Sequence, residues 1–462
     1  MLRSSHGGGT AKSLFRHWRA AAGVTLVAGA CILGWRLGAR RPDAIVAHDP
    51  AASTTAESPA PLETGDVLDQ DIAFYEVRAA EDPYSAGDHA RLALLFLERG
   101  RMRGDPDDAL RAERAARSSL AARTSHNDAA AALLAASLLE QHRFVDAREI
   151  AQYLAARDPE STDYRALLAE TELELGAYAT ADTIFWSLQP HWRQLTVAPR
   201  VARWMEIHGR IEDARLALRT LARDAAADSY VPRSQVAWTW YRLGDFEMRY
   251  GRADAARAAL DAGLRIAPDE HRLLATMARL EASSGNWPAA IALADRSIAV
   301  IPDPDVLGLL SDAHAALGDS AQSNQYARGM AALSLGTPGA IHRSWSVFWL
   351  DRREHVKDVL ARARQESRTR RDVYGDDVLA WALHAAGRNA EAKVTIGRAL
   401  ARGVRDPGIL FHAGMIELAL GNGDDARRHF EAAVSINPRF HPVQAPVAAG
   451  LVDSLKRAVV AP

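Results

Sequence analysis

The chain has 462 residues and a formal net charge of −2, so its overall charge gives no electrostatic reason to expect a nucleic-acid-binding protein. Its single cysteine, Cys31, excludes a disulfide framework, a structural zinc cluster and an iron–sulfur site. The sequence is 48% hydrophobic but only 7% aromatic, and much of the apolar content is alanine, which favours helices. Because nearly all of the positive charge is arginine, arginine abundance alone is weak evidence for phosphate recognition.

The first 19 residues form a basic tail, and an uncharged run follows from Ala20 to Trp35. A basic region before an apolar stretch is the layout of a secretory signal or a signal anchor. Sixteen helical residues span about 24 Å, near the lower limit for crossing a bilayer. We therefore expect residues 20–35 to be a single transmembrane anchor in the cell inner membrane, with the rest of the chain outside the cytoplasm, in the periplasm.

The alternatives to an uncleaved anchor are cleavage, lipidation and a soluble fate. Residues 28–30 offer an A-x-A cleavage site, and Cys31 directly after it weakly resembles a bacterial lipoprotein box. The apolar run continues to Trp35, which favours the anchor, because a mature lipoprotein usually turns polar after its cysteine. Residues 36–66 are rich in proline and small polar residues, which predicts a flexible linker.

From residue 67 onward the sequence repeats itself with a period of about 34 residues. Gly251 recurs as Gly285, and Gly387 recurs as Gly421. Each period holds an apolar helix, a turn marked by glycine, a second apolar helix and often a proline. Glycine can adopt the left-handed conformation that ends the first helix, and proline ends the second.

This pattern resembles the tetratricopeptide repeat family. The clearest unit carries Gly414, Gly421, Ala426, Phe430 and Pro438 at the signature spacings of the family. The resemblance covers about residues 67–440 and implies an all-α fold, a right-handed α-solenoid of about nine to ten helix-turn-helix repeats. We expect residues 441–462 to form a capping helix on the last repeat. With the N-terminal segment, the resemblance implies a bacterial, membrane-anchored member of the family.

No catalytic or metal-binding motif stands out in the repeats. No two histidines are three or four residues apart, so no helix offers a histidine pair to a metal, and no G-x-S-x-G occurs. Residues 343–371 combine arginines with tryptophans, but the acidic residues among them favour a solvated helix face over a nucleic-acid groove. We expect no enzymatic activity, no cofactor, no metal and no nucleic-acid partner.

In the family, the first helix of each unit lines a concave groove where partner peptides dock. Position within the unit, and the preference of interfaces for aromatic and arginine side chains, select nine partner-binding candidates. They are Arg203, Trp238, Tyr241, Arg249, Arg272, Arg279, Trp381, His384 and Phe411. The alternative for each is ordinary packing between repeats. We expect Arg249 and Arg279 to be exposed, and therefore to contribute little to stability.

These observations predict a non-catalytic, membrane-anchored scaffold for protein–protein interaction or complex assembly. The alternative is an envelope accessory protein for polysaccharide handling or secretion, in which aromatic groove residues would stack on sugars. An enzyme subunit whose site is completed by a partner is a third reading. The asparagine and lysine of the family's peptide-carboxylate clamp are absent from the corresponding positions, so a co-chaperone role is not supported.

Overall fold

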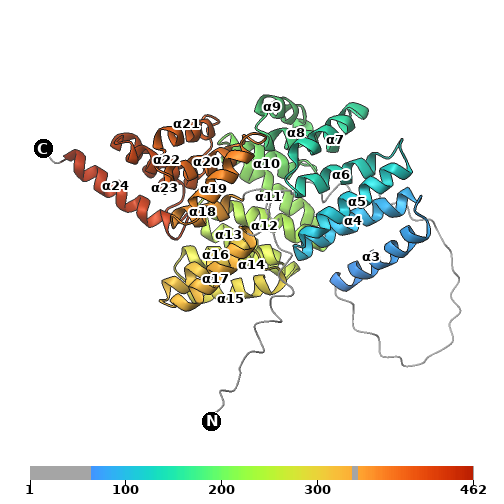
Figure 1. Cartoon of the computed structure of the whole chain (residues 1–462), viewed down its shortest axis with the longest axis horizontal. Coiled ribbons are helices and arrows are strands. Elements are labelled where there is room, and N and C mark those ends of the chain that lie inside the picture. The colour runs from blue at the N-terminus through green and yellow to red at the C-terminus, as the bar shows by residue number, and fades with distance from the viewer. Residues whose placement is uncertain (1–63, 336–341, 461–462) are drawn as a thin grey trace, which may run out of the picture.

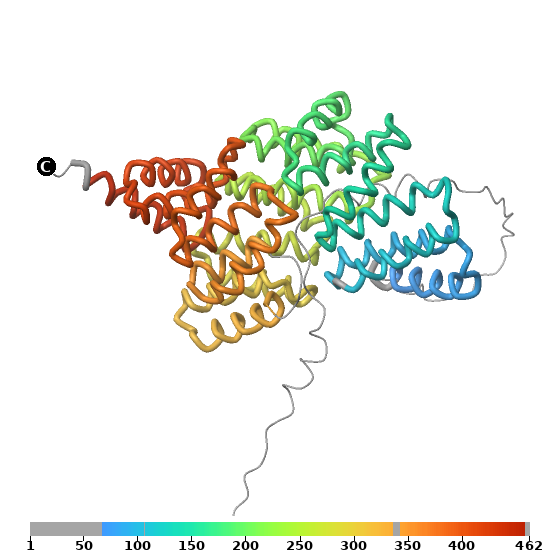
Figure 2. Tube along the Cα trace, turned by 45° about the horizontal axis from the view of Figure 1, so that its top comes forward, coloured from blue at the N-terminus to red at the C-terminus, as the bar shows by residue number. Residues whose placement is uncertain are grey.

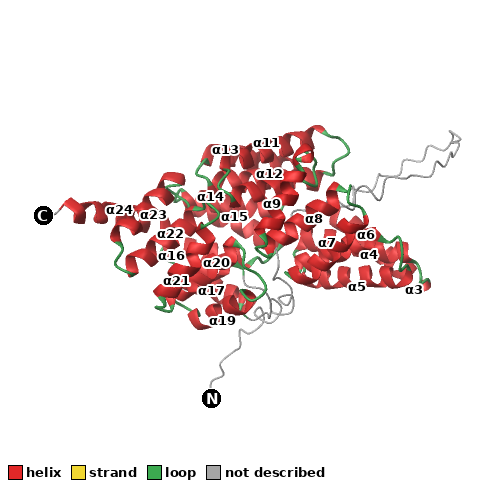
Figure 3. Cartoon of the chain, turned by 90° about the horizontal axis from the view of Figure 1, so that it is seen from above, coloured by secondary structure: helices red, strands yellow, loops and turns green. Residues whose placement is uncertain are grey.

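The computed structural model describes residues 64–335 and 342–460. Within these ranges there are 22 α-helices, one short 3-10 helix and no strand (Figure 3). The predicted all-α solenoid is confirmed. The basic tail at 1–19, the anchor at 20–35 and most of the linker at 36–66 lie outside the described residues. Among the helices that are described, none has an apolar stretch long enough to cross a membrane.

Twenty of the described helices form ten consecutive helix-turn-helix pairs, in agreement with the predicted nine to ten repeats. The first helices are α4 (Ala86–Arg103), α6 (Asp128–Glu140), α8 (Thr162–Glu174), α10 (Ala198–Ile207), α12 (Arg233–Arg249), α14 (His271–Ser283), α16 (Pro304–Ala316), α18 (Arg343–Asp351), α20 (Val373–Ala385) and α22 (Pro407–Ala419). The second helices are α5 (Pro106–Ala122), α7 (Phe144–Arg157), α9 (Tyr178–Ser187), α11 (Ile211–Ala227), α13 (Ala253–Ile266), α15 (Trp287–Val300), α17 (Ser320–Ser334), α19 (Val356–Glu366), α21 (Asn389–Leu400) and α23 (Gly423–Ile436). Helix α3 (Thr64–Glu81) precedes the pairs, α24 (Gln444–Val460) follows them, and the 3-10 helix η1 (Gln189–His191) follows α9.

The turns and helix ends follow the glycine and proline signals in the sequence. Gly176, Gly251 and Gly421 have φ angles of 76°, 73° and 81°, the left-handed conformation that ends a first helix. Pro159 and Pro268 each lie two residues beyond the end of a second helix. The repeat period therefore fixes where each helix begins and ends.

Small residues allow the two helices of a pair to approach closely. Ala256 in α13 and Ala426 in α23 are completely buried. A methyl group at Gly414 in α22 would overlap with the ring of Phe430 in α23. Larger side chains at such positions would overpack the contact between the two helices.

The solenoid winds back on itself, so that units far apart in the sequence touch. The turn between α4 and α5 contacts the loop between α15 and α16. The turns inside the next four pairs contact, in order, the loops that precede α18, α20, α22 and α24. Figures 1 and 2 show the result, with α18–α20 lying beside α10–α12. The five contacts, called the seam below, join Gly104 to Ile301, His142 to His342, Gly176 to Arg371, Gly209 to Gly403, and Gly251 to Asn437.

Direct polar contacts hold the seam together. The backbone N–H of Val373 donates to the hydroxyl of Tyr178 at 2.7 Å. Arg370 forms a buried ion pair with Glu174 at 3.3 Å. The side-chain amide of Asn437 donates to the carbonyl of Met248 at 2.9 Å. These bonds join residues almost 200 positions apart, so the first and last parts of the solenoid are one packed body.

The second seam contact uses histidines where the others use glycine. His142 takes the left-handed conformation, with φ of 57°, and its ring lies 4.8 Å from that of His342. Burial lowers the pKa of His142 well below its usual value and, with the nearby Arg370 charge, lowers that of His342 to about 4. Both rings are therefore neutral at pH 7, and the contact forms without charge repulsion.

Candidate functional site

The concave side of the solenoid encloses a cavity of about 1080 Å³. All ten first helices contribute to its lining, so α18, α20 and α22 share it with α8, α10 and α12. Eleven arginines and eleven acidic residues line the cavity, so its wall is balanced in charge as a whole. Specific binding there must come from local imbalance rather than from a uniform field.

Six of the nine predicted binding residues line this cavity together. They are Arg203 of α10, Trp238, Tyr241 and Arg249 of α12, and Arg272 and Arg279 of α14. Three consecutive units in register place these first helices side by side. The guanidinium of Arg272 lies 5.8 Å from the ring centre of Tyr241, which links α14 to α12 within one wall.

The other three predicted residues, Trp381, His384 and Phe411, do not line the cavity. Trp381 is 6% exposed and Phe411 is 4% exposed. Trp381 stacks between His384 and His412, with ring centres 4.8 and 4.3 Å away. Phe440 lies against Phe411 at 6.0 Å, so the C-terminal segment of the chain covers this part of the concave side. The groove position of Trp381 and Phe411 is corrected here, because both rings are buried by packing, and the half-buried His384 lies outside the cavity lining.

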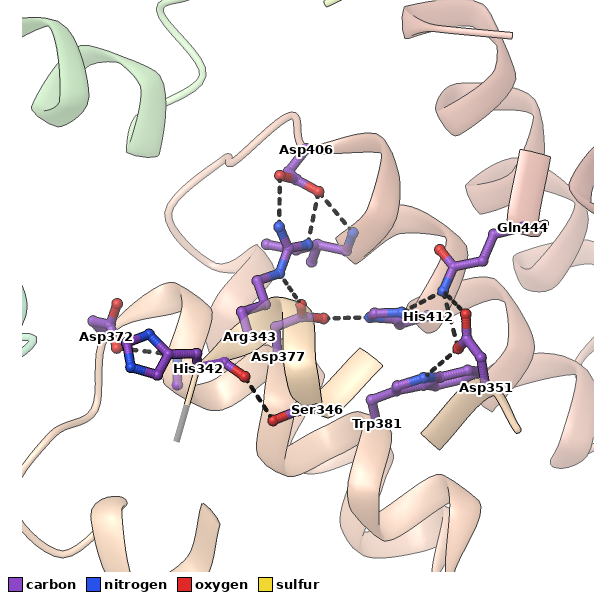
Figure 4. Close-up of polar contacts among 12 residues, drawn as sticks. His342, Arg343, Ser346, Asp351, Asp372, Asp377, Trp381, Asp406, His412 and Gln444 are labelled. Carbon is purple, nitrogen blue, oxygen red and sulfur yellow. Dashed lines mark hydrogen bonds and ion pairs between the residues drawn. The ribbon is translucent and has the colours of Figure 1, made fainter. Parts of the chain in front are cut away.

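A buried polar network surrounds Trp381 and ties four helices together (Figure 4). The indole N–H of Trp381 donates to Asp351 at 2.9 Å, and the side-chain amide of Gln444 in α24 donates to the same carboxylate. The network reaches His412, whose ring contacts both Gln444 and Asp377. This end of the solenoid is therefore closed by α24 through polar bonds as well as apolar contacts.

Arg343 is the charged centre of this network. Its guanidinium donates to Asp377 at 2.7 Å and to Asp406 at 3.0 Å. Burial would raise the pKa of Asp377, but the His412 and Arg343 charges lower it to about 2. Asp406 in turn accepts a hydrogen bond from the backbone N–H of Ile409 at 3.0 Å and so caps α22. The arrangement positions helices and leaves no free acid or base.

Arg249 corrects a second expectation, since it is not an exposed surface arginine. It pairs with Glu206 of α10 and with Asp245 of α12, the latter at 3.0 Å. Glu206 is 6% exposed in its side chain and also accepts from the hydroxyl of Tyr250 at 3.1 Å. Arg249 therefore neutralises a buried carboxylate, and its removal would leave that charge unpaired.

Sequence reasoning missed many wall residues, among them Arg242, Arg343, Arg370 and Tyr374. Arg242 directly follows Tyr241 in α12, and its position in the repeat unit is not one of those assigned to the groove. The other three come from the opposite side of the seam, and Tyr374 lies between the guanidiniums of Arg203 and Arg343 at 5.6 and 5.4 Å. No signal within a single repeat reports such a contact.

No group of three or more histidine, cysteine or acidic side chains in residues 64–335 and 342–460 could hold a metal ion. Burial and the neighbouring Asp305 charge raise the pKa of Asp303 to about 7. However, the Asp303 carboxylate accepts from the backbone N–H of Asp305 at 2.8 Å and caps α16. A structural role explains this acid.

The profile of the tetratricopeptide repeat family matches residues 378–439. This stretch spans the helices from α20 to α23. No curated protein matches the chain in sequence.

Similar solved structures include the Cut9–Hcn1 hetero-tetramer of the APC/C, with 17% identity over 85% of this chain and 67% of that chain and a TM-score of 0.46. Human IFIT1, solved with PPP-AAAA, has 14% identity over 81% of this chain and 95% of its own, with a TM-score of 0.43. PilF of Pseudomonas aeruginosa has 17% identity over 46% of this chain and 93% of its own, with a TM-score of 0.37.

Proposed function

We propose that this chain is a non-catalytic scaffold that binds a segment of a partner protein in its cavity. The carrying observation is that six residues from α10, α12 and α14 form one wall of that cavity. Tryptophan, tyrosine and arginine are the side chains that most often anchor protein interfaces. The volume of about 1080 Å³ lies at the upper end of small-molecule sites, which favours an extended segment over a compact metabolite.

We also propose that residues 20–35 anchor the scaffold in the inner membrane of a bacterial cell, with the repeats in the periplasm. The support is the basic tail before an uncharged run of sixteen residues. A reporter that works only in the cytoplasm, fused after residue 462, should be inactive. Reporter activity would contradict this topology, and a mature amino terminus at Cys31 would replace the anchor with cleavage or lipidation.

Site-specific photocrosslinking tests the docking proposal. A photoreactive benzoylphenylalanine at Tyr241 in the full chain should capture a partner protein in the native membrane, because Tyr241 lines the cavity. The matched control is the same residue at Tyr153 of α7, which is 50% exposed and lies outside the cavity lining. Identical products from both positions, or none from Tyr241, would contradict docking in the cavity.

A further inference from the structure

Arg242 of α12 is a cation in the cavity wall that lacks an anionic partner. Its guanidinium lies 5.4 Å from the ring centre of Trp238, and the half-buried side chain lines the cavity. In the part of the chain that the structure describes, Arg242 makes neither a hydrogen bond nor an ion pair with any residue. The other arginines of α12 and α14 that line the cavity each have an acidic partner.

The acids nearest to Arg242 are already engaged by other groups. Asp245 pairs with Arg249 at 3.0 Å and with Arg279 at 3.8 Å. Glu206 is held by Arg249 and by the hydroxyl of Tyr250. The single carboxylate of Asp245 thus pairs with the guanidiniums of Arg249 and Arg279, and none is left for Arg242. This wall carries a local excess of positive charge although the cavity as a whole is balanced.

The energetics at Arg242 follow from this arrangement. Burial lowers the pKa of Arg242, with a further contribution from the Arg203 charge. Burial acts on Arg249 in the same way, but the Glu206 and Asp245 charges raise the pKa of Arg249 well above its usual value. Partial burial of a cation without a counter-ion raises the free energy of the folded protein. An anion that enters the cavity and pairs with Arg242 would offset this desolvation penalty.

We propose that Arg242, over the face of Trp238, binds a carboxylate of an acidic segment of the partner protein. The inference rests on the proposed function and names the chemistry of the segment. The planar guanidinium matches a carboxylate in two parallel hydrogen bonds. The neighbouring Tyr241 ring, which is half-buried and lines the cavity, offers apolar area to the residues flanking that carboxylate.

The rest of the lining favours a protein segment over a nucleic acid. A nucleic-acid strand carries one negative charge per nucleotide, and a lining of eleven arginines and eleven acids offers no continuous positive stripe to match them. A protein segment can place one or two carboxylates at the local excess and neutral residues elsewhere. The geometry thus favours an acidic peptide, whose flexible side chains can bring a carboxylate to the local excess of positive charge.

Fluorescence anisotropy with the purified full chain tests the assignment. The probe is a fluorescein-labelled hexaglutamate peptide, and a labelled hexaglutamine peptide of the same length is the neutral control. Hexaglutamate should bind, hexaglutamine should bind at least tenfold more weakly, and added NaCl should weaken only the hexaglutamate complex. Absence of hexaglutamate binding, or equal binding of the two peptides, would overturn the assignment.

Two variants and a control locate the binding to Arg242. Arg242→Gln should lose at least tenfold in hexaglutamate affinity, whereas Arg242→Lys, which keeps the charge, should lose less. Arg265→Gln is the matched control, because Arg265 is exposed on α13 in the same unit and does not line the cavity. Equal affinities of Arg242→Gln and Arg265→Gln would overturn the proposal.

The outcome for the acidic segment can be separated from the outcome for the scaffold. If hexaglutamate does not bind but Tyr241 still gives specific crosslinks, the proposal of an acidic segment is overturned and the proposal of docking in the cavity is retained. Loss of the Tyr241 crosslinks would instead overturn the docking proposal on which the inference rests.

Discussion

Arginines on the concave side of this solenoid differ from ordinary surface arginines because buried acids surround them. Arg249 bridges Glu206 on the preceding unit and Asp245 one turn earlier on its own helix. Arg203 pairs with Glu174, which is 2% exposed, at 2.7 Å. The same residue types that anchor interfaces therefore also hold adjacent repeats together, and only unpaired members such as Arg242 are free for a ligand.

Arg249→Ala should destabilise the protein by about 3 kcal/mol, because it leaves the buried Glu206 carboxylate without its charge partner. The measurement is urea unfolding followed by circular dichroism at 222 nm. Arg265→Ala provides the comparison, since this exposed arginine makes no ion pair in the described residues and should change stability by less than about 0.5 kcal/mol. Equal unfolding midpoints for the two variants would show that Glu206 is satisfied without Arg249.

At the scale of the element, the repeat period predicted the helices well, even where its signals are weak. The pair α18–α19 has no glycine in its turn, and Arg353 and His355 adopt positive φ angles of 55° and 49° instead. Continuation of the phase still places two helices there, because neighbouring units must bury the same faces. The glycine in a turn and the proline after a helix act on the backbone next to them. The sequence around each turn is therefore sufficient to predict where the helices end.

The candidate site was predictable only in part, for a physical reason. The wall formed by α10, α12 and α14 follows from the register of adjacent units, so Arg203, Tyr241 and Arg279 could be assigned from position alone. The same rule placed Trp381 in the groove, but α24 and the segment before it cover that region through Asp351 and Gln444. Contacts between distant segments leave no trace in a 34-residue period.

At the scale of the whole molecule, the seam changes how the solenoid responds to damage. In an open solenoid, each repeat contacts only its neighbours, and stability is nearly a sum of local terms. Here the turns of the first five pairs also contact loops in the second half of the chain, from Ile301 to Asn437. The structure therefore predicts that a change in a turn of α8–α9 is felt at α20.

Two glycines with the same backbone conformation allow the effect of the seam to be distinguished from the effect of local backbone strain. Gly176 and Gly387 have φ angles of 76° and 75°, so Gly176→Ala and Gly387→Ala carry the same local cost of about 1–2 kcal/mol. At Gly176 the added methyl group would overlap with the carbonyl of Arg371 across the seam, whereas at Gly387 no atom lies within 4 Å. Only the first variant should push the two parts of the solenoid apart.

Hydrogen exchange at Val373 gives a direct readout, because its amide is protected by the hydroxyl of Tyr178 on the other side of the seam. Gly176→Ala should accelerate exchange at Val373 and in the loop before it, as well as in its own turn. Gly387→Ala should accelerate exchange only around the α20–α21 turn. If the two variants leave Val373 equally protected, each side of the seam is held by its own neighbouring repeats and the seam contact adds nothing to the stability of α20.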